Sequence, residues 1–201
     1  MHLAEGYIYH VYNRGNNKRS LFLTDEHYLH FLRLVNRTLV PYCDILAWCL
    51  MPNHFHFLVA ANETSVHTIN DGSFPRQRFS QQIKQLLSSY TKAVNKQMGF
   101  TGSLFQQKKK SVCVNVDSEY SYALTAFHYI HQNPIRAGLV NKMEDWEFSS
   151  FKDHLGLRAG KLCNIQLAAS LLDLDVKHLY KESYKIIRED VLSNIIDKTF
   201  I

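Results

Sequence analysis

Residues 44–60, DILAWCLMPNHFHFLVA, are the stretch that decides the fold. The apolar runs at 44–50 and 54–60 are rich in β-branched and aromatic side chains, which favours strands. Between them lies Met-Pro-Asn at 51–53, where proline fixes φ and removes a backbone donor. The sequence therefore predicts a β-hairpin, and the other elements can be placed around it.

The sequence before the hairpin predicts one strand and one helix. The strand lies at 7–12, and the helix can be capped by Thr24 or Asp25 and ends before Pro41. The apolar face expected for this helix consists of Leu29, Leu32, Val35, Asn36 and Leu39.

The sequence after the hairpin predicts two more helices and a fourth strand. Residues 62–78 contain turn-forming residues and are expected to be irregular. A helix at 79–98 and a strand at 112–116 follow, and then a helix that Ser118 can cap and that ends at Asn133, before Pro134. The apolar face expected for the helix at 79–98 consists of Ile83, Leu86, Leu87, Tyr90 and Val94.

The predicted order of elements is βαββαβ followed by a helix. This order predicts an α+β fold, a ferredoxin-like sandwich in which an antiparallel sheet carries helices on one face. We expect one domain at 1–150 and a helical C-terminal extension at 151–201.

The composition is ordinary for a soluble globular protein, and the chain is basic. Hydrophobic residues make up 46% of the chain and charged residues 20%, and the formal net charge is +5. This charge favours nucleic acid as a partner, although many basic proteins bind none. No stretch approaches the roughly 20 apolar residues that cross a bilayer, and there is no signal-peptide pattern, so we expect a cytoplasmic protein without a membrane partner. The cysteines have no C-x-x-C spacing, so neither a zinc knuckle nor a disulfide framework is expected.

His54 and His56 are the first candidate functional residues. Because successive side chains of a strand point to opposite faces, the two imidazoles project together, while Phe55 and Phe57 point the other way. Two ring nitrogens can then converge on one cation. Eleven histidines in 201 residues give about half a His-x-His pair by chance. The alternative of two surface or core histidines therefore stays open.

Tyr129 and Asn133 are a second candidate pair. They are four positions apart and so lie on one face of the last predicted helix, where a phenol oxygen and an amide oxygen can point toward the same metal or phosphate. By itself this spacing favours a core tyrosine and an asparagine that ends a helix.

Five motifs occur in order along the first three-quarters of the chain. They are YHVYNRG at 9–15, MPNHFHFLV at 51–59, GSLFQ at 102–106, YIHQNPIRAGLV at 129–140 and WEFSSF at 146–151. Together they resemble the REP-associated tyrosine transposases, a branch of the HUH single-strand DNA transposases, and the second and fourth motifs are highly specific. Phe105 stands where that family often has tryptophan, and the segment after about residue 150 has no counterpart.

The resemblance implies a metal-dependent DNA transposase with a ferredoxin-like catalytic domain. It implies that Tyr129 is the nucleophile that forms a 5′-phosphotyrosine link. It also implies that His54, His56 and Asn133 bind a divalent metal, Mg²⁺ or Mn²⁺. The implied partner is single-stranded or hairpin DNA near repetitive extragenic palindromes (REPs). Related transposases include dimers that share active sites and monomers that do not, and we expect a monomer here.

Basic and aromatic residues beside the motifs are candidate DNA contacts. Tyr12, if exposed, can stack on unpaired bases. The cations expected to neutralise phosphates are Arg14, Lys108, Lys109, Lys110 and Arg136. For each lysine, a solvated surface position is the alternative.

Two other classes of function remain open. The first is a non-catalytic domain of the same fold that binds single-stranded nucleic acid. The second is a metal-dependent hydrolase or oxygenase, which needs a carboxylate beside His54 and His56. No Asp or Glu has a spacing that places it there.

Overall fold

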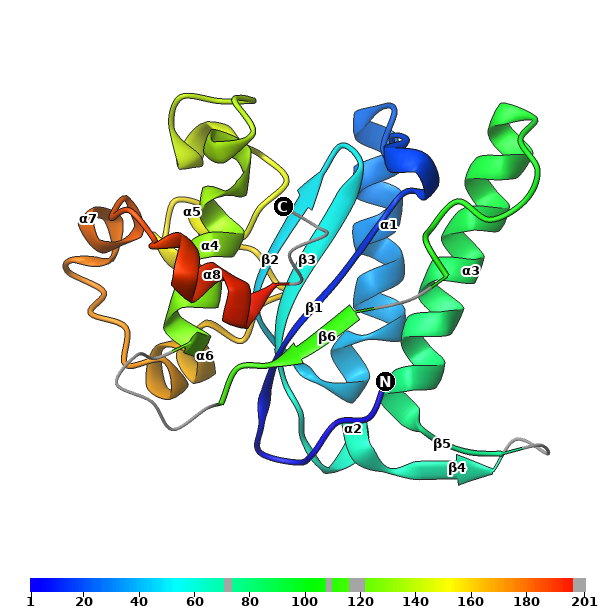
Figure 1. The fold of residues 1–201 in the computed structure, drawn as a ribbon, viewed down its shortest axis with the longest axis horizontal. Coiled ribbons are helices and arrows are strands. Elements are labelled where there is room, and N and C mark those ends of the chain that lie inside the picture. The colour runs from blue at the N-terminus through cyan, green and yellow to red at the C-terminus, as the bar shows by residue number, and fades with distance from the viewer. Residues whose placement is uncertain (71–73, 108–109, 116–121, 197–201) are drawn as a thin grey trace.

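A four-stranded antiparallel sheet with the strand order β2-β3-β1-β6 forms the centre of the molecule. The computed structural model describes residues 1–70, 74–107, 110–115 and 122–196. Helices enclose the sheet on both faces (Figure 1). The strands are β1 (Ile8–Arg14), β2 (Asp44–Met51), β3 (His54–Ala60) and β6 (Lys110–Cys113).

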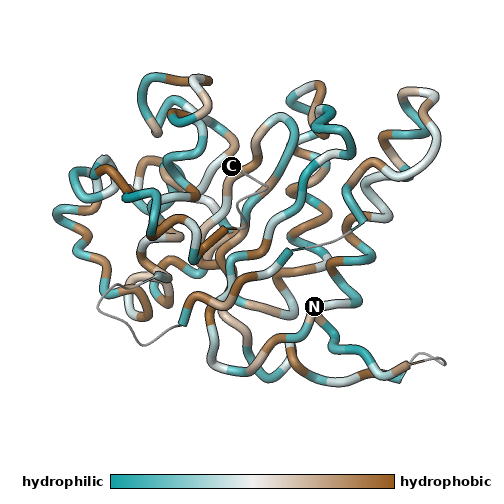
Figure 2. Tube along the Cα trace, viewed as in Figure 1, coloured by the Kyte–Doolittle hydropathy of each residue, from teal (hydrophilic) through white to brown (hydrophobic). Residues whose placement is uncertain are grey.

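The helices α1 (Asp25–Thr38) and α3 (Arg78–Met98) pack against each other on one face of the sheet. Apolar and polar residues alternate in bands along both helices (Figure 2). The apolar bands meet the strands in an aromatic core in which Phe31, Phe57 and Tyr90 are 0% exposed. Burying such rings is the main source of hydrophobic stabilisation in this layer.

The other face is covered by α4 (Tyr122–Arg136) and by the C-terminal quarter of the chain (Figure 1). α4 packs against β1, β2 and β3, and α8 packs against α4 and β6. Leu172, Leu192 and Ile195 contribute to a second apolar core there. The segment after residue 150 thus helps to cover the sheet. Its helices are α5 (Phe151–His154), α6 (Ile165–Leu171), α7 (Leu179–Ser183) and α8 (Glu189–Ile195).

The remaining elements are short. They are α2 (Glu63–Val66), the two-stranded hairpin of β4 (Thr68–Asn70) and β5 (Pro75–Gln77), and the 3-10 helices η1 (Asn16–Lys18), η2 (Val40–Tyr42) and η3 (Met143–Asp145). Within the described ranges, no helix is both long and apolar enough to span a membrane.

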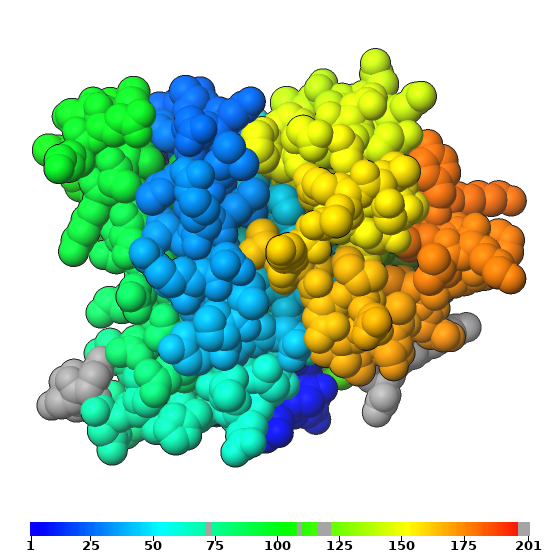
Figure 3. All heavy atoms as spheres, turned by 180° about the vertical axis from the view of Figure 1, so that it is seen from behind, coloured from blue at the N-terminus to red at the C-terminus, as the bar shows by residue number. Residues whose placement is uncertain are grey.

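The segment at 148–150 covers the outer edge of β2. The backbone N–H of Leu50 donates to the carbonyl of Phe148 at 2.8 Å, and the N–H of Ser150 donates to the carbonyl of Trp48 at 2.9 Å. Seen from behind, the surfaces of α1 and of residues 140–180 lie on either side of this edge (Figure 3). A covered edge strand cannot pair with the edge of another chain.

The predicted α+β class and antiparallel sheet are confirmed, and the order β1-α1-β2-β3-α3-β6 is consistent with a ferredoxin-like sandwich. The five residues predicted for the apolar face of α3 are all buried. The sequence predicts helices on one face of the sheet, and the structure adds a second layer because α4 and α8 bury apolar side chains on the other.

Three local predictions are wrong. In α1 the aromatic residues Tyr28 and Phe31 face the core, because they bury more area, and Leu29 is 41% exposed. Residues 62–78 are not wholly irregular, since they contain α2 and the β4–β5 hairpin. α4 continues through Pro134 to Arg136 instead of ending before the proline. The cap predicted at Ser118 lies outside the described residues.

Proline interrupts α4 so little because of where it stands. It stands in the last turn, so it removes one N–H, the one that would donate to the carbonyl of Ile130, and only two helical residues follow it. The residues around it, from Tyr129 to Pro134, are buried. Their packing offsets the missing hydrogen bond.

Candidate active site

β3 presents two imidazoles on the face of the sheet that α4 covers. The ring centroids of His54 and His56 are 4.9 Å apart, with the ring planes at 87°. Phe55 and Phe57 pack in the aromatic core beneath α1 and α3. The alternation of side chains along β3 therefore places the two histidines on one face of the sheet and the two phenylalanines on the other, as the sequence predicts.

α4 brings a tyrosine and an asparagine to the imidazole pair. The Tyr129 ring lies edge to face with the His56 ring, at 5.7 Å between centroids. Nδ2 of Asn133 donates to the backbone carbonyl of Tyr129 at 2.8 Å. The Asn133 side chain also interacts with the side chains of His54 and Tyr129 and shifts their pKa values. The four residues singled out from two separate motifs are thus brought together.

Burial favours the neutral form of the His54 and His56 imidazoles. Burial lowers the pKa of His54 to about 4, a shift that a hydrogen bond with Asn133 opposes and the Arg14 cation reinforces. Burial, together with the neighbouring His54 and His10 rings, holds the pKa of His56 well below its usual range. A neutral imidazole keeps one basic nitrogen, and this is the form that binds metal ions.

Tyr129 is 5% exposed, and its hydroxyl is difficult to ionise. Burial raises the pKa of Tyr129 to about 12, although the Arg136 cation and a hydrogen bond with Asn133 act in the opposite direction. The Arg136 guanidinium lies over the Tyr129 ring, 5.9 Å from its centroid. Two pKa units correspond to about 3 kcal/mol, so the phenolate needs more stabilisation here than in water.

The donor set fits a divalent cation with nitrogen and oxygen ligands. Nδ1 of His54 lies 2.6 Å from Oδ1 of Asn53. Because that oxygen can only accept, Nδ1 carries the proton and Nε2 of His54 is the basic nitrogen. His56 and Asn133 offer a second imidazole and an amide oxygen.

The described residues also limit what such a cation site can be. Among them, no group of three or more His, Cys, Asp or Glu side chains could hold a metal ion. Within the described part of the chain, the side chain beside His54 and His56 that could supply a third ligand is Asn133. For the same reason, the described part of the chain offers no carboxylate for the facial site of a hydrolase or oxygenase.

Two of the predicted DNA contacts border the site. Arg14 is half-buried and pairs with His54 across β1 and β3. Arg136 is exposed at the end of α4, with its cation over the Tyr129 ring. One cation is therefore beside His54 and the other beside Tyr129.

The other predicted contacts have different outcomes. Lys110 is the first residue of β6 and pairs with Tyr12 of β1. Lys108 and Lys109 lie outside the described residues. The suggestion that Tyr12 is exposed for base stacking is wrong, because its ring is 1% exposed and lies 4.8 Å from the His10 ring.

A third imidazole, which the sequence does not single out, joins the pair. His10 of β1 is 0% exposed, and its Nε2 lies 2.9 Å from Nδ1 of His56. Its Nδ1 lies 2.6 Å from the carbonyl oxygen of Ile195 in α8. The period of two along β1 places His10 on the face of Tyr12, but nothing in the motifs places α8 beside it.

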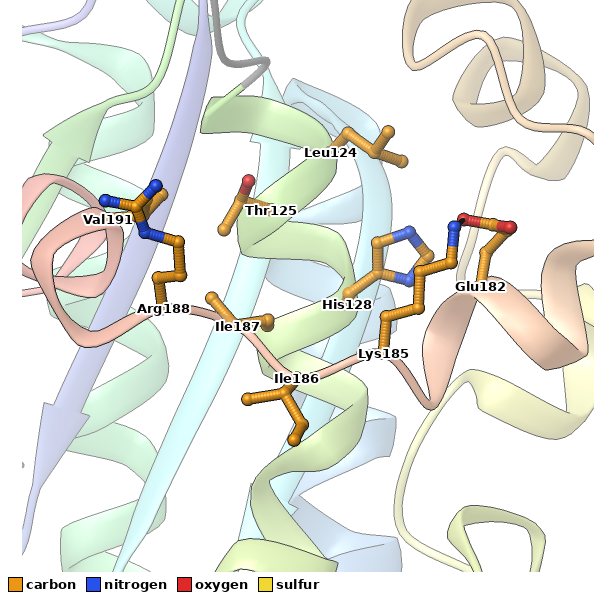
Figure 4. Close-up of a pocket in the computed structure, with 9 residues that line it drawn as sticks. All are labelled: Leu124, Thr125, His128, Glu182, Lys185, Ile186, Ile187, Arg188 and Val191. Atoms are coloured by element: carbon orange, nitrogen blue, oxygen red, sulfur yellow. Dashed lines mark ion pairs between the residues drawn. The ribbon is translucent and has the colours of Figure 1, made fainter.

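Two cavities lie apart from the four predicted site residues. One, of about 250 Å³, lies between α4 and residues 182–191 (Figure 4). His128 of α4 faces it, and the ion pair of Glu182 and Lys185, at 2.5 Å, lies on its wall. The other, of about 440 Å³, lies between α3 and residues 102–107. Neither is lined by the imidazole pair or by Tyr129.

The fold and the site define a class of protein, an antiparallel α+β sandwich in which a strand-borne imidazole pair meets a tyrosine on a helix. No family model matches the chain. A Haemophilus influenzae protein named REP-associated tyrosine transposase is 24% identical over 108 residues, which are 54% of this chain and 58% of that protein. The chain thus spans less than two thirds of this relative's length.

A solved structure shows the same likeness over nearly the whole chain. It is that of a REP-associated tyrosine transposase bound to a REP hairpin, with a TM-score of 0.58 and 19% identity. The match covers 94% of this chain and 97% of that one, and it establishes the fold. In sequence and in fold, the chain is similar to REP-associated tyrosine transposases.

Proposed function

We propose that the chain is a metal-dependent transposase that cleaves and rejoins single-stranded or hairpin DNA through a 5′-phosphotyrosine intermediate. The observation that carries this proposal is the meeting of His54, His56, Asn133 and Tyr129 at one place on the sheet. The similarity to REP-associated tyrosine transposases supports it, as does the net charge of +5.

The proposed substrate is a REP or a similar palindromic hairpin. The structural neighbour is bound to a REP hairpin. In the present chain, Arg14 beside His54 and Arg136 over the Tyr129 ring would neutralise phosphates, and Lys108, Lys109 and Lys110 are further candidates by sequence.

His54, His56 and Asn133 would hold Mg²⁺ or Mn²⁺. When bound, the cation supplies positive charge that stabilises the phosphate as negative charge builds up on it. Imidazole ligands favour the later metal, Mn²⁺, over Mg²⁺. His54 is ready for this role because Asn53 already fixes its proton on Nδ1.

Tyr129 would perform the transfer itself. Its hydroxyl oxygen attacks phosphorus, the bond from phosphorus to the 3′ oxygen breaks, and the phenol proton is lost while the leaving oxygen gains one. The Arg136 cation favours the phenolate, in opposition to the burial that raises the pKa of Tyr129. Because the new linkage keeps the phosphoester energy, a later 3′ hydroxyl can attack it, release Tyr129 and rejoin strands without ATP.

A non-catalytic single-stranded nucleic-acid-binding domain of the same fold is the second candidate. The burial of Tyr129 favours it, because a ring that is 5% exposed must gain access to a phosphate before it can react. It predicts DNA binding without covalent chemistry.

Labelled hairpin DNA incubated with the protein and Mn²⁺, then run on a denaturing gel, distinguishes these functions. The transposase proposal predicts a covalent protein–DNA adduct that Tyr129→Phe abolishes. Tyr122→Phe, which removes the hydroxyl of another tyrosine of α4, is the matched control and should keep the adduct. Cleaved DNA without an adduct would indicate hydrolysis, and binding without cleavage would indicate the inert domain.

A further inference from the structure

We propose that His10 is a positioning residue that fixes the tautomer of His56. The hydrogen-bonded relay consists of the Ile195 carbonyl, His10 and His56, and it holds the His56 proton on Nδ1, so that Nε2 is the basic nitrogen available to a cation. The inference rests on the proposed function for the role of that cation, but the relay itself belongs to the apo protein.

The relay begins at the end of α8. The last carbonyls of a helix have no intrahelical N–H partner and need a donor from elsewhere. The carbonyl of Ile195 lies 2.6 Å from Nδ1 of His10, and the His10 side chain is fully buried. Because a carbonyl oxygen can only accept, Nδ1 of His10 carries a proton.

The second step sets the proton of His56. A fully buried imidazole is neutral unless a charge compensates it, so His10 has one proton and its Nε2 is an acceptor. Nε2 of His10 lies 2.9 Å from Nδ1 of His56, at hydrogen-bond distance, with the two ring centroids 5.0 Å apart. The donor in this bond must therefore be Nδ1–H of His56.

The relay makes the two imidazoles of the pair alike. Asn53 accepts from Nδ1 of His54, and His10 accepts from Nδ1 of His56. In both rings Nε2 is then the basic nitrogen. The partner of His54 is its neighbour Asn53, whereas the partner of His56 is His10, which in turn depends on the carbonyl of Ile195, 185 positions further along the chain. Outer hydrogen bonds of this kind fix the tautomer and orientation of metal-binding histidines.

The tautomer can be tested by ¹⁵N NMR on protein labelled in histidine, without metal or DNA. The chemical shifts of the two ring nitrogens show which one is protonated, and the His56 signals are assigned as those missing from His56→Gln. We expect wild-type His56 to be protonated on Nδ1. His10→Phe removes the acceptor and should give a mixture of tautomers. His10→Gln, whose Oε1 can accept in place of Nε2, should restore the wild-type pattern.

Titration with Mn²⁺ alone gives the second readout. His10→Phe should weaken Mn²⁺ binding by about 10–100-fold, the usual cost of losing an outer-shell partner. His10→Gln should stay within about threefold of wild type. His27→Phe, which removes a buried histidine of α1 on the other face of the sheet, is the matched control and should bind Mn²⁺ as wild type does.

The outcomes separate this inference from the proposed function. Protonation of wild-type His56 on Nε2, or wild-type Mn²⁺ affinity and tautomer in His10→Phe, would overturn the relay. If His10→Phe does not fold, the wild-type spectrum and the match between His10→Gln and wild type decide the question. A protein with the expected tautomer and Mn²⁺ affinity that forms no DNA adduct would contradict the transposase proposal and leave the relay standing.

Discussion

The two faces of the central sheet are made by the same strands and differ in what they bury. The face beneath α1 and α3 holds mostly hydrocarbon rings packed on one another, such as Phe31, Phe55 and Phe57. The face beneath α4 holds rings with polar atoms, His10, His56 and Tyr129. An apolar ring needs only a complementary shape, whereas each buried nitrogen needs a partner. The two imidazoles and the tyrosine predicted as site residues therefore lie on one side of a shared scaffold.

Acid should destabilise the molecule through the α4 face, and this is the largest effect expected. Burial lowers the pKa of His128 and of His154 to about 4, whereas an unfolded chain titrates near 6.5. The unfolded state therefore binds more protons between these values, and the free energy of unfolding falls as the pH drops from about 6.5 to 4. The expected loss is up to about 3 kcal/mol for each histidine. Urea unfolding at a series of pH values measures it.

A variant assigns this acid sensitivity to the α4 face. Nε2 of His154 lies 2.9 Å from the carbonyl of Leu46. His154→Gln can keep an N–H for that carbonyl while removing the titrating ring, so the loss of stability between pH 6.5 and 4 should become smaller. His67→Gln, at an exposed position, should change nothing. Equal slopes for His154→Gln and wild type would show that the sensitivity lies elsewhere.

Two residues of β3, one on each face of the sheet, should respond differently to substitution by alanine. Phe57→Ala should lower the free energy of unfolding by about 3–5 kcal/mol, because it leaves a cavity in the aromatic core. The folded fraction should still bind Mn²⁺. His54→Ala should abolish Mn²⁺ binding at a cost of about 1 kcal/mol in stability, because His54 is only half-buried. Chemical denaturation and Mn²⁺ titration of both variants provide the comparison, and equal losses of stability would contradict it.

The smallest effect is expected at the rim of the α4 face. Arg136→Gln removes the cation over the Tyr129 ring and should raise the pKa of Tyr129 further. A cation over an aromatic ring at an exposed position contributes about 0.5–1 kcal/mol, so adduct formation should slow by about two- to fivefold. Arg136→Lys should retain most of the rate. Single-turnover formation of the adduct measures both variants, and an unchanged rate in Arg136→Gln would exclude this role.

The sequence predicts the site well where the pattern is local. The period of two along β3 sends His54 and His56 to one face, and the period of the helix in α4 aligns Tyr129 with Asn133. The structure brings these four residues together as expected. Their assignment as metal ligands and nucleophile stays a prediction.

The sequence does not predict features that depend on competition or on distant contacts. In α1, both Tyr28 and Leu29 could face the core by sequence, and only the packing of the folded chain buries the tyrosine and exposes the leucine. The rule that a helix ends before a proline fails at Pro134, because the turn around this proline is buried. The partner of His10 is a backbone carbonyl, which carries no signature of residue type. It can be found only from coordinates.

The hydrogen bond between His10 and the Ile195 carbonyl can form only late in the synthesis of the chain. A ribosome must add the 185 residues that separate the two before the bond can form, which takes roughly 10–40 s at about 5–20 residues per second. During this delay a nascent chain already carries the two histidines of β3 but lacks the helix that orders their neighbour. The bond from His10 to the Ile195 carbonyl can therefore form only after translation has passed α8.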